Sequence, residues 1–178
     1  LAGFSLSAVS GDKSQGTVGM SDLWIIKLDP NGNLLWEKTV QMAESERVSA
    51  MELTPDGGMA IACNYNPAVE EFENFFNARF IKLSSTGELE WSRNLLENIT
   101  LSSLALTSDG GYIIGANDSG WENNENQYTA IKLSSDGTLQ WTKKIGGTGY
   151  SALREIQQTP DGGFILSGIS QSQAGGDK

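Results

Sequence analysis

The sequence repeats one pattern three times, with a period of about 52 residues. The first marker reads IKLDPNGNLLW at 26–36, IKLSSTGELEW at 81–91 and IKLSSDGTLQW at 131–141. The second marker follows each copy, as TPDGG at 54–58, TSDGG at 107–111 and TPDGG at 159–163. A repeated supersecondary unit buries its apolar face only by stacking on its neighbours, so this period constrains the architecture of the whole chain.

Each period contains four short segments with strand character, bounded by Gly, Pro, Asn and Asp. The predicted strands are residues 22–28, 34–40, 48–54 and 59–65, then 78–83, 89–95, 101–107 and 112–117, then 128–133, 139–145, 152–159 and 164–169. Short turns join the first strand of a period to the second and the third to the fourth. The sequence therefore predicts one four-stranded antiparallel meander per period, in chain order.

Glycine and aspartate recur at equivalent positions of these short turns. A tight hairpin needs a residue at positive φ, which glycine adopts without a Cβ clash. Aspartate can accept a hydrogen bond from the backbone two residues downstream. The predicted structural turn residues are Gly32, Gly87 and Gly137 in the first marker and Asp56, Asp109 and Asp161 in the second.

A tryptophan ends each copy of the first marker, two residues after a leucine that lies on the same strand face. We expect Trp36, Trp91 and Trp141 to pack each unit against the next. The alternative is that these rings stack on a sugar.

Four antiparallel strands repeated near 50 residues are typical of a β-propeller blade. The predicted fold is all-β, with three consecutive blades at 22–65, 66–117 and 118–170. Residues 1–21 are then the end of a preceding strand with its loop, and 171–178 begin the next loop. Because the chain begins and ends at the same phase, we expect a partial propeller, or half of a six-bladed assembly completed by a second copy.

The strings SSDGTLQW and TPDGGFIL resemble the repeats of secreted and surface proteins of Bacteroidetes-type bacteria. The pattern is also similar to the tryptophan-docking repeat of pyrroloquinoline-quinone-type propellers, in which a glycine stands four residues before the tryptophan, as Gly32 does before Trp36. The resemblance covers nearly the whole chain. It implies a propeller blade fold and a secreted, cell-surface or periplasmic location.

Composition excludes several classes of function. The net charge of −10 and the lack of a Lys/Arg cluster argue against nucleic-acid binding. No apolar run is long enough to span a bilayer. The chain has no histidine, and its one cysteine, Cys63, aligns with small residues of the other periods, so we expect a core residue there. DPNGN at 29–33 is predicted to be a turn, not a calcium loop, and no metal or cofactor is expected.

The three copies differ most in the connections at the strand ends opposite the short turns. Aromatic rings among acidic and amide side chains can stack on a sugar or bind a peptide. The predicted ligand-binding residues are Phe72 and Glu73 in the 66–77 connection, Trp121, Glu122 and Asn123 in the 118–127 connection, and Tyr150 before the 152–159 strand. The alternative is that the phenylalanines cap the blade locally and the charges are solvated.

We therefore expect a non-enzymatic extracellular scaffold that binds a protein or glycan through these variable connections. Its expected partners are further blades of the same longer chain or a second copy, and an extracellular protein or glycan. One alternative is a non-catalytic part of a larger carbohydrate-active or quinone-dependent enzyme. Another is a structural spacer without a ligand.

Overall fold

The computed structural model of the chain describes residues 2–17, 21–40, 45–66, 76–118, 127–147 and 149–171. These residues contain no helix, so none is long and apolar enough to cross a membrane. The thirteen strands are β1 (Ala2–Ser5), β2 (Asp22–Leu28), β3 (Leu34–Val40), β4 (Ser45–Leu53), β5 (Met59–Asn66), β6 (Asn77–Leu83), β7 (Leu89–Asn94), β8 (Ile99–Leu106), β9 (Tyr112–Asp118), β10 (Tyr128–Leu133), β11 (Leu139–Ile145), β12 (Ser151–Gln158) and β13 (Phe164–Ser170). The predicted all-β class is confirmed, and every predicted strand overlaps an observed one.

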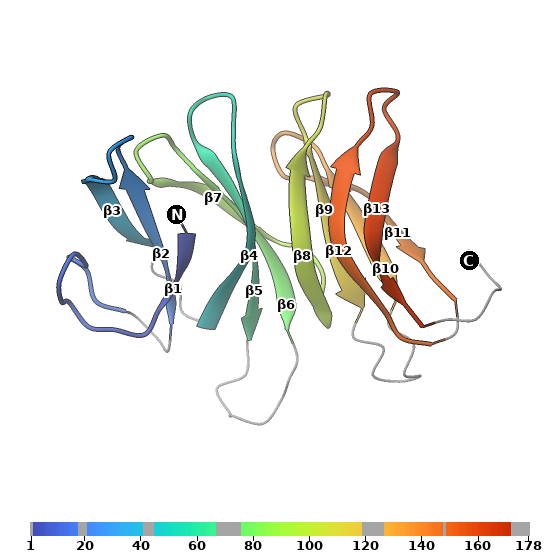
Figure 1. The fold of residues 1–178 in the computed structure, drawn as a ribbon, viewed down its shortest axis with the longest axis horizontal. Helices are drawn as coiled ribbons and strands as arrows, with labels where there is room; N and C mark the ends of the chain where they lie inside the picture. Colours follow the sequence, from blue (N-terminus) through green and yellow to red (C-terminus); the bar gives the residue numbers. More distant parts are fainter. Residues whose placement is uncertain are drawn as a thin grey trace.

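The strands form four antiparallel sheets, none of which closes on itself (Figure 1). Their strand orders are β1-β2-β3, β4-β5-β6-β7, β8-β9-β10-β11 and β12-β13. The sheets stand side by side, with β8 packed against β4 on one side and β12 on the other. The strands β3, β7 and β11 form the opposite edges of their sheets.

Each sheet is a chain-order meander as predicted, but the strands are grouped into sheets differently from the prediction. Each four-stranded sheet joins the last two strands of one period to the first two of the next, so β3 and β4 belong to different sheets. The sheets therefore straddle the boundaries predicted at 65/66 and 117/118.

Burial explains this difference. The strands β5 and β6 are buried along nearly their whole length and need a neighbour on both sides, whereas β7 is largely exposed and suits an edge. The continuous apolar runs MAIAC and YIIGA carry this signal in the sequence.

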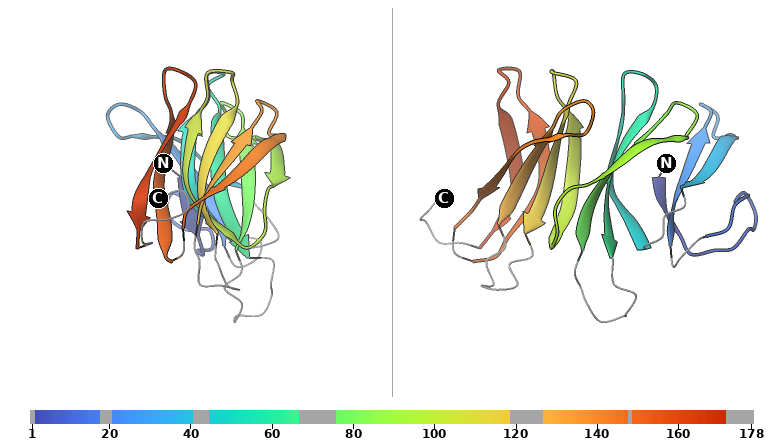
Figure 2. Two further views of the ribbon diagram at one scale, coloured as in Figure 1. Left: turned by 90° about the vertical axis from the view of Figure 1, so that its right-hand side faces the viewer. Right: turned by 180° about the vertical axis from the view of Figure 1, so that it is seen from behind.

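Two kinds of tight turn lie at one end of the strands, called here the turn end (Figure 2). In the first marker, Gly32, Gly87 and Gly137 have φ of 86°, 80° and 80°. The strand pairs β2–β3, β6–β7 and β10–β11 each shift register beside this turn, as a bulge requires. The opposite ends of the strands are called here the loop end.

The tryptophans contact the turn of the following period. The Trp36 ring lies against Gly87, and the Trp91 ring lies against Gly137. Trp91 also packs on Phe80, with ring centroids 5.6 Å apart, in the core between the β4–β7 and β8–β11 sheets. Trp141 is 38% exposed and makes an edge contact with Phe164 at 5.6 Å. The first two rings thus pack consecutive sheets together.

The contact between Trp91 and Gly137 gives a direct test of this packing. A Cβ on Gly137 would lie 2.5 Å from the Trp91 ring, whereas a Cβ on Gly32 would meet nothing within 4 Å. Both substitutions by alanine cost about 1 kcal/mol for the left-handed backbone. We expect Gly137→Ala to cost about 1–3 kcal/mol more than Gly32→Ala in chemical unfolding, because it also overpacks the ring. Equal losses would mean that the ring does not pack there in solution.

Candidate functional site

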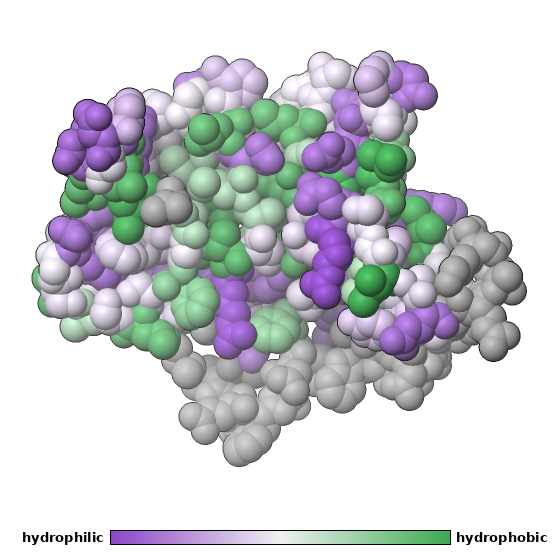
Figure 3. Space-filling view, in the orientation of Figure 1, coloured by the Kyte–Doolittle hydropathy of each residue, from purple (hydrophilic) through white to green (hydrophobic). Residues whose placement is uncertain are grey.

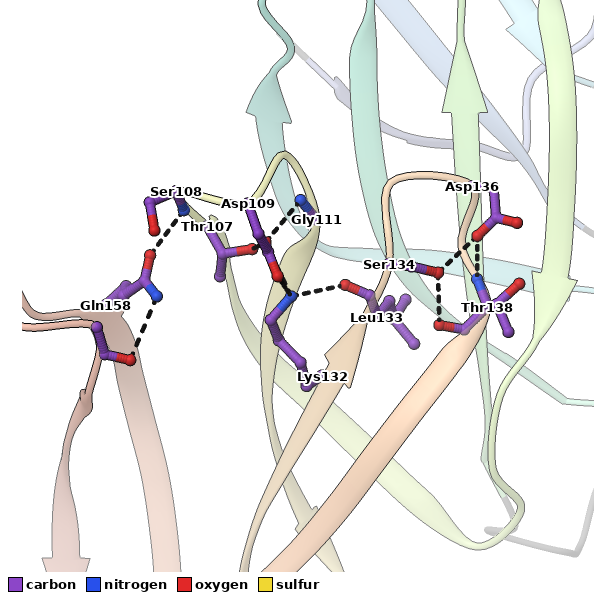
Figure 4. Close-up of polar contacts among 11 residues, drawn as sticks. Thr107, Ser108, Asp109, Gly111, Lys132, Leu133, Ser134, Asp136, Thr138 and Gln158 are labelled. Atoms are coloured by element: carbon purple, nitrogen blue, oxygen red, sulfur yellow. Dashed lines mark hydrogen bonds and ion pairs between the residues drawn. The ribbon is translucent and has the colours of Figure 1, made fainter.

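The second marker forms a turn at the C-terminal end of β4, β8 and β12, called here the DGG turn. In the middle copy, the Asp109 carboxylate accepts hydrogen bonds from the backbone N–H of Gly111 at 3.0 Å and the Thr107 hydroxyl at 2.5 Å (Figure 4). Gly110 supplies the positive φ of 79°. Asp56 makes the same two contacts, with Gly58 and Thr54. The carboxylate is therefore part of the turn.

A lysine from the next strand pair completes each of these two turns. The Lys132 ammonium group, on β10, lies 2.9 Å from the Asp109 carboxylate and donates to the Leu133 carbonyl at 3.0 Å (Figure 4). The Lys82 ammonium group on β6 contacts Asp56 and the Leu83 carbonyl in the same way. Both lysine side chains are only 6% exposed, so each ammonium group depends on its acceptors, which for Lys82 also include the Glu90 carboxylate at 3.2 Å. This arrangement is called here the turn–lysine contact.

Electrostatics assign these carboxylates a structural role. The pKa of Asp109 lies well below its ordinary value, mainly because of the Thr107 hydroxyl and then because of Lys132. The pKa of Asp56 is lowered in the same way by Thr54 and Lys82. Carboxylates held ionised by such partners are poor proton donors near neutral pH.

The first-marker turns bind their own aspartates as well. In the third copy, Asp136 accepts hydrogen bonds from the Ser134 hydroxyl and the Thr138 N–H. In the first copy, the Asp29 carboxylate accepts from the backbone N–H groups of Asn31 and Asn33, both at 2.8 Å. The Asn33 side-chain amide, which donates to Asp29 at 2.8 Å, and then the backbone bonds lower the pKa of Asp29, and the Ser134 hydroxyl is the main cause of the lowered pKa of Asp136. Among the described residues, no group of three or more His, Cys, Asp or Glu could hold a metal ion.

Most of the predicted ligand-binding residues fall outside the described part of the chain. Phe72, Glu73, Trp121, Glu122 and Asn123 lie outside it. Tyr150 lies at the loop end, directly before β12, and its side chain is 42% exposed. Its backbone carbonyl accepts a hydrogen bond from the Gln171 N–H at 2.8 Å, which ties this position to the end of β13.

A buried polar cluster occupies the loop end of the β4–β7 sheet, and the sequence reasoning missed it. Arg79, 6% exposed, lies 3.1 Å from the fully buried Glu46 carboxylate and donates to the Asn94 side-chain oxygen at 2.9 Å. The Tyr65 ring faces the Arg79 guanidinium at 4.1 Å. The sequence feature that could have indicated this cluster is the arginine in the strand NARFIKL, because the other periods have Trp24 and Thr129 at that position.

This cluster also surrounds the lone cysteine. Cys63 pairs with Arg79 across β5 and β6 and is fully buried, as the sequence predicted. Burial, and then the nearby Glu46 charge, raise the pKa of the thiol to about 12. A thiol that stays protonated at neutral pH is a weak nucleophile.

Two asparagines connect consecutive sheets near the loop end. The Asn64 side chain on β5 accepts from the Leu101 N–H at 2.9 Å and donates to the Ile99 carbonyl at 2.8 Å. The Asn117 side chain on β9 accepts from the Leu153 N–H at 2.6 Å, the equivalent bond, and donates to the Leu153 carbonyl at 3.2 Å. These bonds hold the first strand of each following sheet in place.

A cavity of about 370 Å³ lies between the β1–β3 and β4–β7 sheets, toward the turn end. Its wall is mainly apolar and consists of Ile25, Ile26, Lys27, Leu28, Trp36, Met51, Leu53, Gly57, Met59 and Ser85. At the next interface the Phe80 and Tyr112 rings, 4.7 Å apart, stand where Ile25 and Met59 stand here. Smaller side chains thus account for the empty volume.

Comparison with known proteins adds a fold relationship. No family model matches the chain, and no curated protein matches it. Among solved structures, the chain is similar to a protein of unknown function from Bacteroides caccae, with 13% sequence identity and a TM-score of 0.53. The alignment covers 85% of this chain and 48% of that one, so the chain spans about half the length of that protein. At this identity the likeness concerns the fold alone.

The cavity allows a test with the chain's own residues. Ile25→Phe introduces the ring that the next interface has at Phe80, and we expect it to leave stability unchanged or to add up to about 1 kcal/mol. Ile81→Phe, at a buried position outside the cavity wall, should cost about 1–3 kcal/mol through overpacking. Thermal unfolding of both variants measures the difference. A cost for Ile25→Phe as large as for Ile81→Phe would contradict the cavity.

The DGG turns predict a pH dependence of stability. The pKa of Asp56 and Asp109 in the folded chain lies below the ordinary value of 3.8, so their contribution is complete above about pH 4 and is lost as pH falls further. We expect Asp109→Asn to lower stability at pH 7 by about 1 kcal/mol and to flatten this acid-side decline. Asp136→Asn removes a turn carboxylate that has no lysine partner among the described residues, and should lower stability less. Urea unfolding from pH 2.5 to 7 distinguishes the variants.

Proposed function

We propose that the chain is part of a β-propeller-type repeat protein and acts as a non-enzymatic extracellular scaffold. Recognition takes place at the loop end of the strands, and the ligand is an extracellular protein or a glycan. The observation that carries this proposal is the difference between the two strand ends. At the turn end, the polar side chains of the repeated markers are used by the turns themselves.

The loop end has the opposite character. Its connections differ in length and sequence among the three periods, and Tyr150 exposes an aromatic ring there. Rigid scaffolds commonly carry recognition residues on variable connections of this kind. The buried Arg79–Glu46 pair and the Asn64 and Asn117 side chains provide that rigidity by fixing the strand ends below the connections.

The arrangement of the sheets supports the propeller-type part of the proposal. Four-stranded antiparallel sheets stack in sequence order, and β4, β8 and β12 meet where successive sheets come together. In a propeller these would be the innermost strands and β3, β7 and β11 the outermost. The resemblance of the markers to repeats of secreted and surface Bacteroidetes proteins supports the proposed location.

The binding site can be tested with single substitutions at the loop end. Ligands are first identified by a glycan array and by pull-down with the recombinant chain. We then expect Tyr150→Ala and Trp121→Ala each to weaken binding about tenfold or more in biolayer interferometry, as for aromatic residues at interface centres. Leu53→Ala, at the turn end and 67% exposed, is the matched control and should bind like the unmodified chain. Unchanged binding by both aromatic variants would refute the site.

A further inference from the structure

The β12–β13 sheet has two strands among the described residues, whereas the two preceding sheets have four. Each pair β4–β5 and β8–β9 extends into two more strands, whereas β13 is an edge among the described residues. The effect on burial is large, because Ile165 on β13 is 61% exposed and the equivalent Ile113 on β9 is fully buried. Figure 3 shows hydrophobic residues at the surface on the right-hand side, where β12 and β13 lie in Figure 1. Ile169 on β13 is 50% exposed. The edge of β13 is therefore an apolar strand without a neighbour in the described structure.

The other two sheets show what joins such an edge. In each of them, a hairpin with I-K-L in its first strand pairs with β5 or β9, the strands equivalent to β13. For β9–β10 the register is Ile114↔Ile131 and Tyr112↔Leu133. The turn–lysine contact then ties this hairpin to the DGG turn. The last glycine of the turn is essential to that approach, because a Cβ on Gly58 or Gly111 would overlap the carbonyl oxygen of Leu83 or Leu133.

The last DGG turn keeps its half of this contact. The Asp161 carboxylate accepts from the Thr159 hydroxyl and the Gly163 N–H, as its two counterparts do, and these bonds lower its pKa. No lysine reaches it among the described residues. A Cβ on Gly163 would meet only the Thr159 and Asp161 side-chain oxygens, at 3.0 and 3.3 Å. Asp161 and Gly163 thus have the conformation of the other turns without the hairpin that those turns bind.

We propose that β13 with its DGG turn is an acceptor edge for a β-hairpin of this chain's own repeat type. The partner hairpin carries I-K-L in its first strand and tryptophan in its second. Its lysine binds the Asp161 carboxylate, its leucine carbonyl lies against Gly163, and its isoleucine pairs with Leu166 in the β9–β10 register. Main-chain bonds to β13 supply affinity, and the lysine with the glycine supplies specificity. This inference rests on the repeat architecture and not on ligand recognition at the loop end.

One hairpin of the chain has the lysine half of the contact free. Lys27 on β2 is exposed, and no hydrogen bond or ion pair joins its ammonium group to the other described residues. The edge of β2 is covered by β1, which pairs as β5 does with β6: Ala2↔Ile25 corresponds to Ala62↔Phe80. A second copy could therefore pair its β2–β3 hairpin with β13 only after its own β1 had left β2. A hairpin added as a separate peptide does not need this release.

The experiment uses the full chain and a labelled synthetic peptide of residues 128–145, which form β10–β11. We expect saturable binding in fluorescence anisotropy. Gly163→Ala in the chain, or Lys132→Gln in the peptide, should each weaken that binding at least tenfold. Gly3→Ala is the control, because its Cβ meets nothing within 4 Å, and it should leave binding unchanged. Circular dichroism and thermal unfolding verify that Gly163→Ala folds as the unmodified chain does.

Solution mass identifies the donor of the hairpin. If the chain self-associates and Gly163→Ala makes it a 19.1 kDa monomer, a second copy occupies the edge and the proposal stands. A monomeric chain that binds the peptide, with the losses above, also supports it. The proposal is overturned if the chain neither binds the peptide nor self-associates, or if Gly163→Ala behaves like the unmodified chain. Neither result bears on the Tyr150 and Trp121 variants, so the loop-end proposal is tested separately.

Discussion

The turn–lysine contact is the interaction on which the grouping of strands into the four-stranded sheets depends. It links the second marker of one period to the first marker of the next, through Asp109 and Lys132 or Asp56 and Lys82. The lysines are nearly buried, so an unpaired ammonium group there would be costly. The threonine hydroxyl of the turn, and then the lysine itself, lower the pKa of each aspartate. The contact explains why both markers recur together. The second marker supplies the aspartate, and the first marker of the next period supplies the lysine that binds it.

Local features of the fold could be predicted from the sequence, and the grouping of strands into sheets could not be predicted as readily. Turns such as 29–33 and 107–111 depend on neighbouring residues, so glycine and aspartate specify them wherever they occur. Sheet order depends on which strands need two neighbours, and the burial of β5 and β6 decides it. That information was present in the apolar runs, but the repeat period suggested more strongly that the four strands of one period share a sheet. Each sheet keeps chain order, but β4–β7 and β8–β11 begin at the third strand of a period, because the longer connections β5–β6 and β9–β10 also join paired strands.

The candidate site was less predictable because its features are departures from the repeat. Arg79 and Glu46 have no charged equivalents in the other periods, and neither side chain alone indicates a buried pair. Their contact joins β4 and β6, two strands that the predicted meander assigned to different units. The cavity beside Ile25 and Met59 likewise follows from comparing side-chain size at equivalent interfaces, which requires the correct pairing of sheets.

The three interfaces are filled differently although the backbone repeats. Phe80 is replaced by Ile25 in the first period and by Ala130 in the third, while the DGG turns and their glycines stay the same. Core composition therefore does not determine the strand register by itself. Turn geometry and the lysine contacts fix the register, and the side chains between sheets need only be apolar and of tolerable volume. Since that register is fixed at the turn end, the connections at the loop end can vary in length and sequence without changing the strands that carry them.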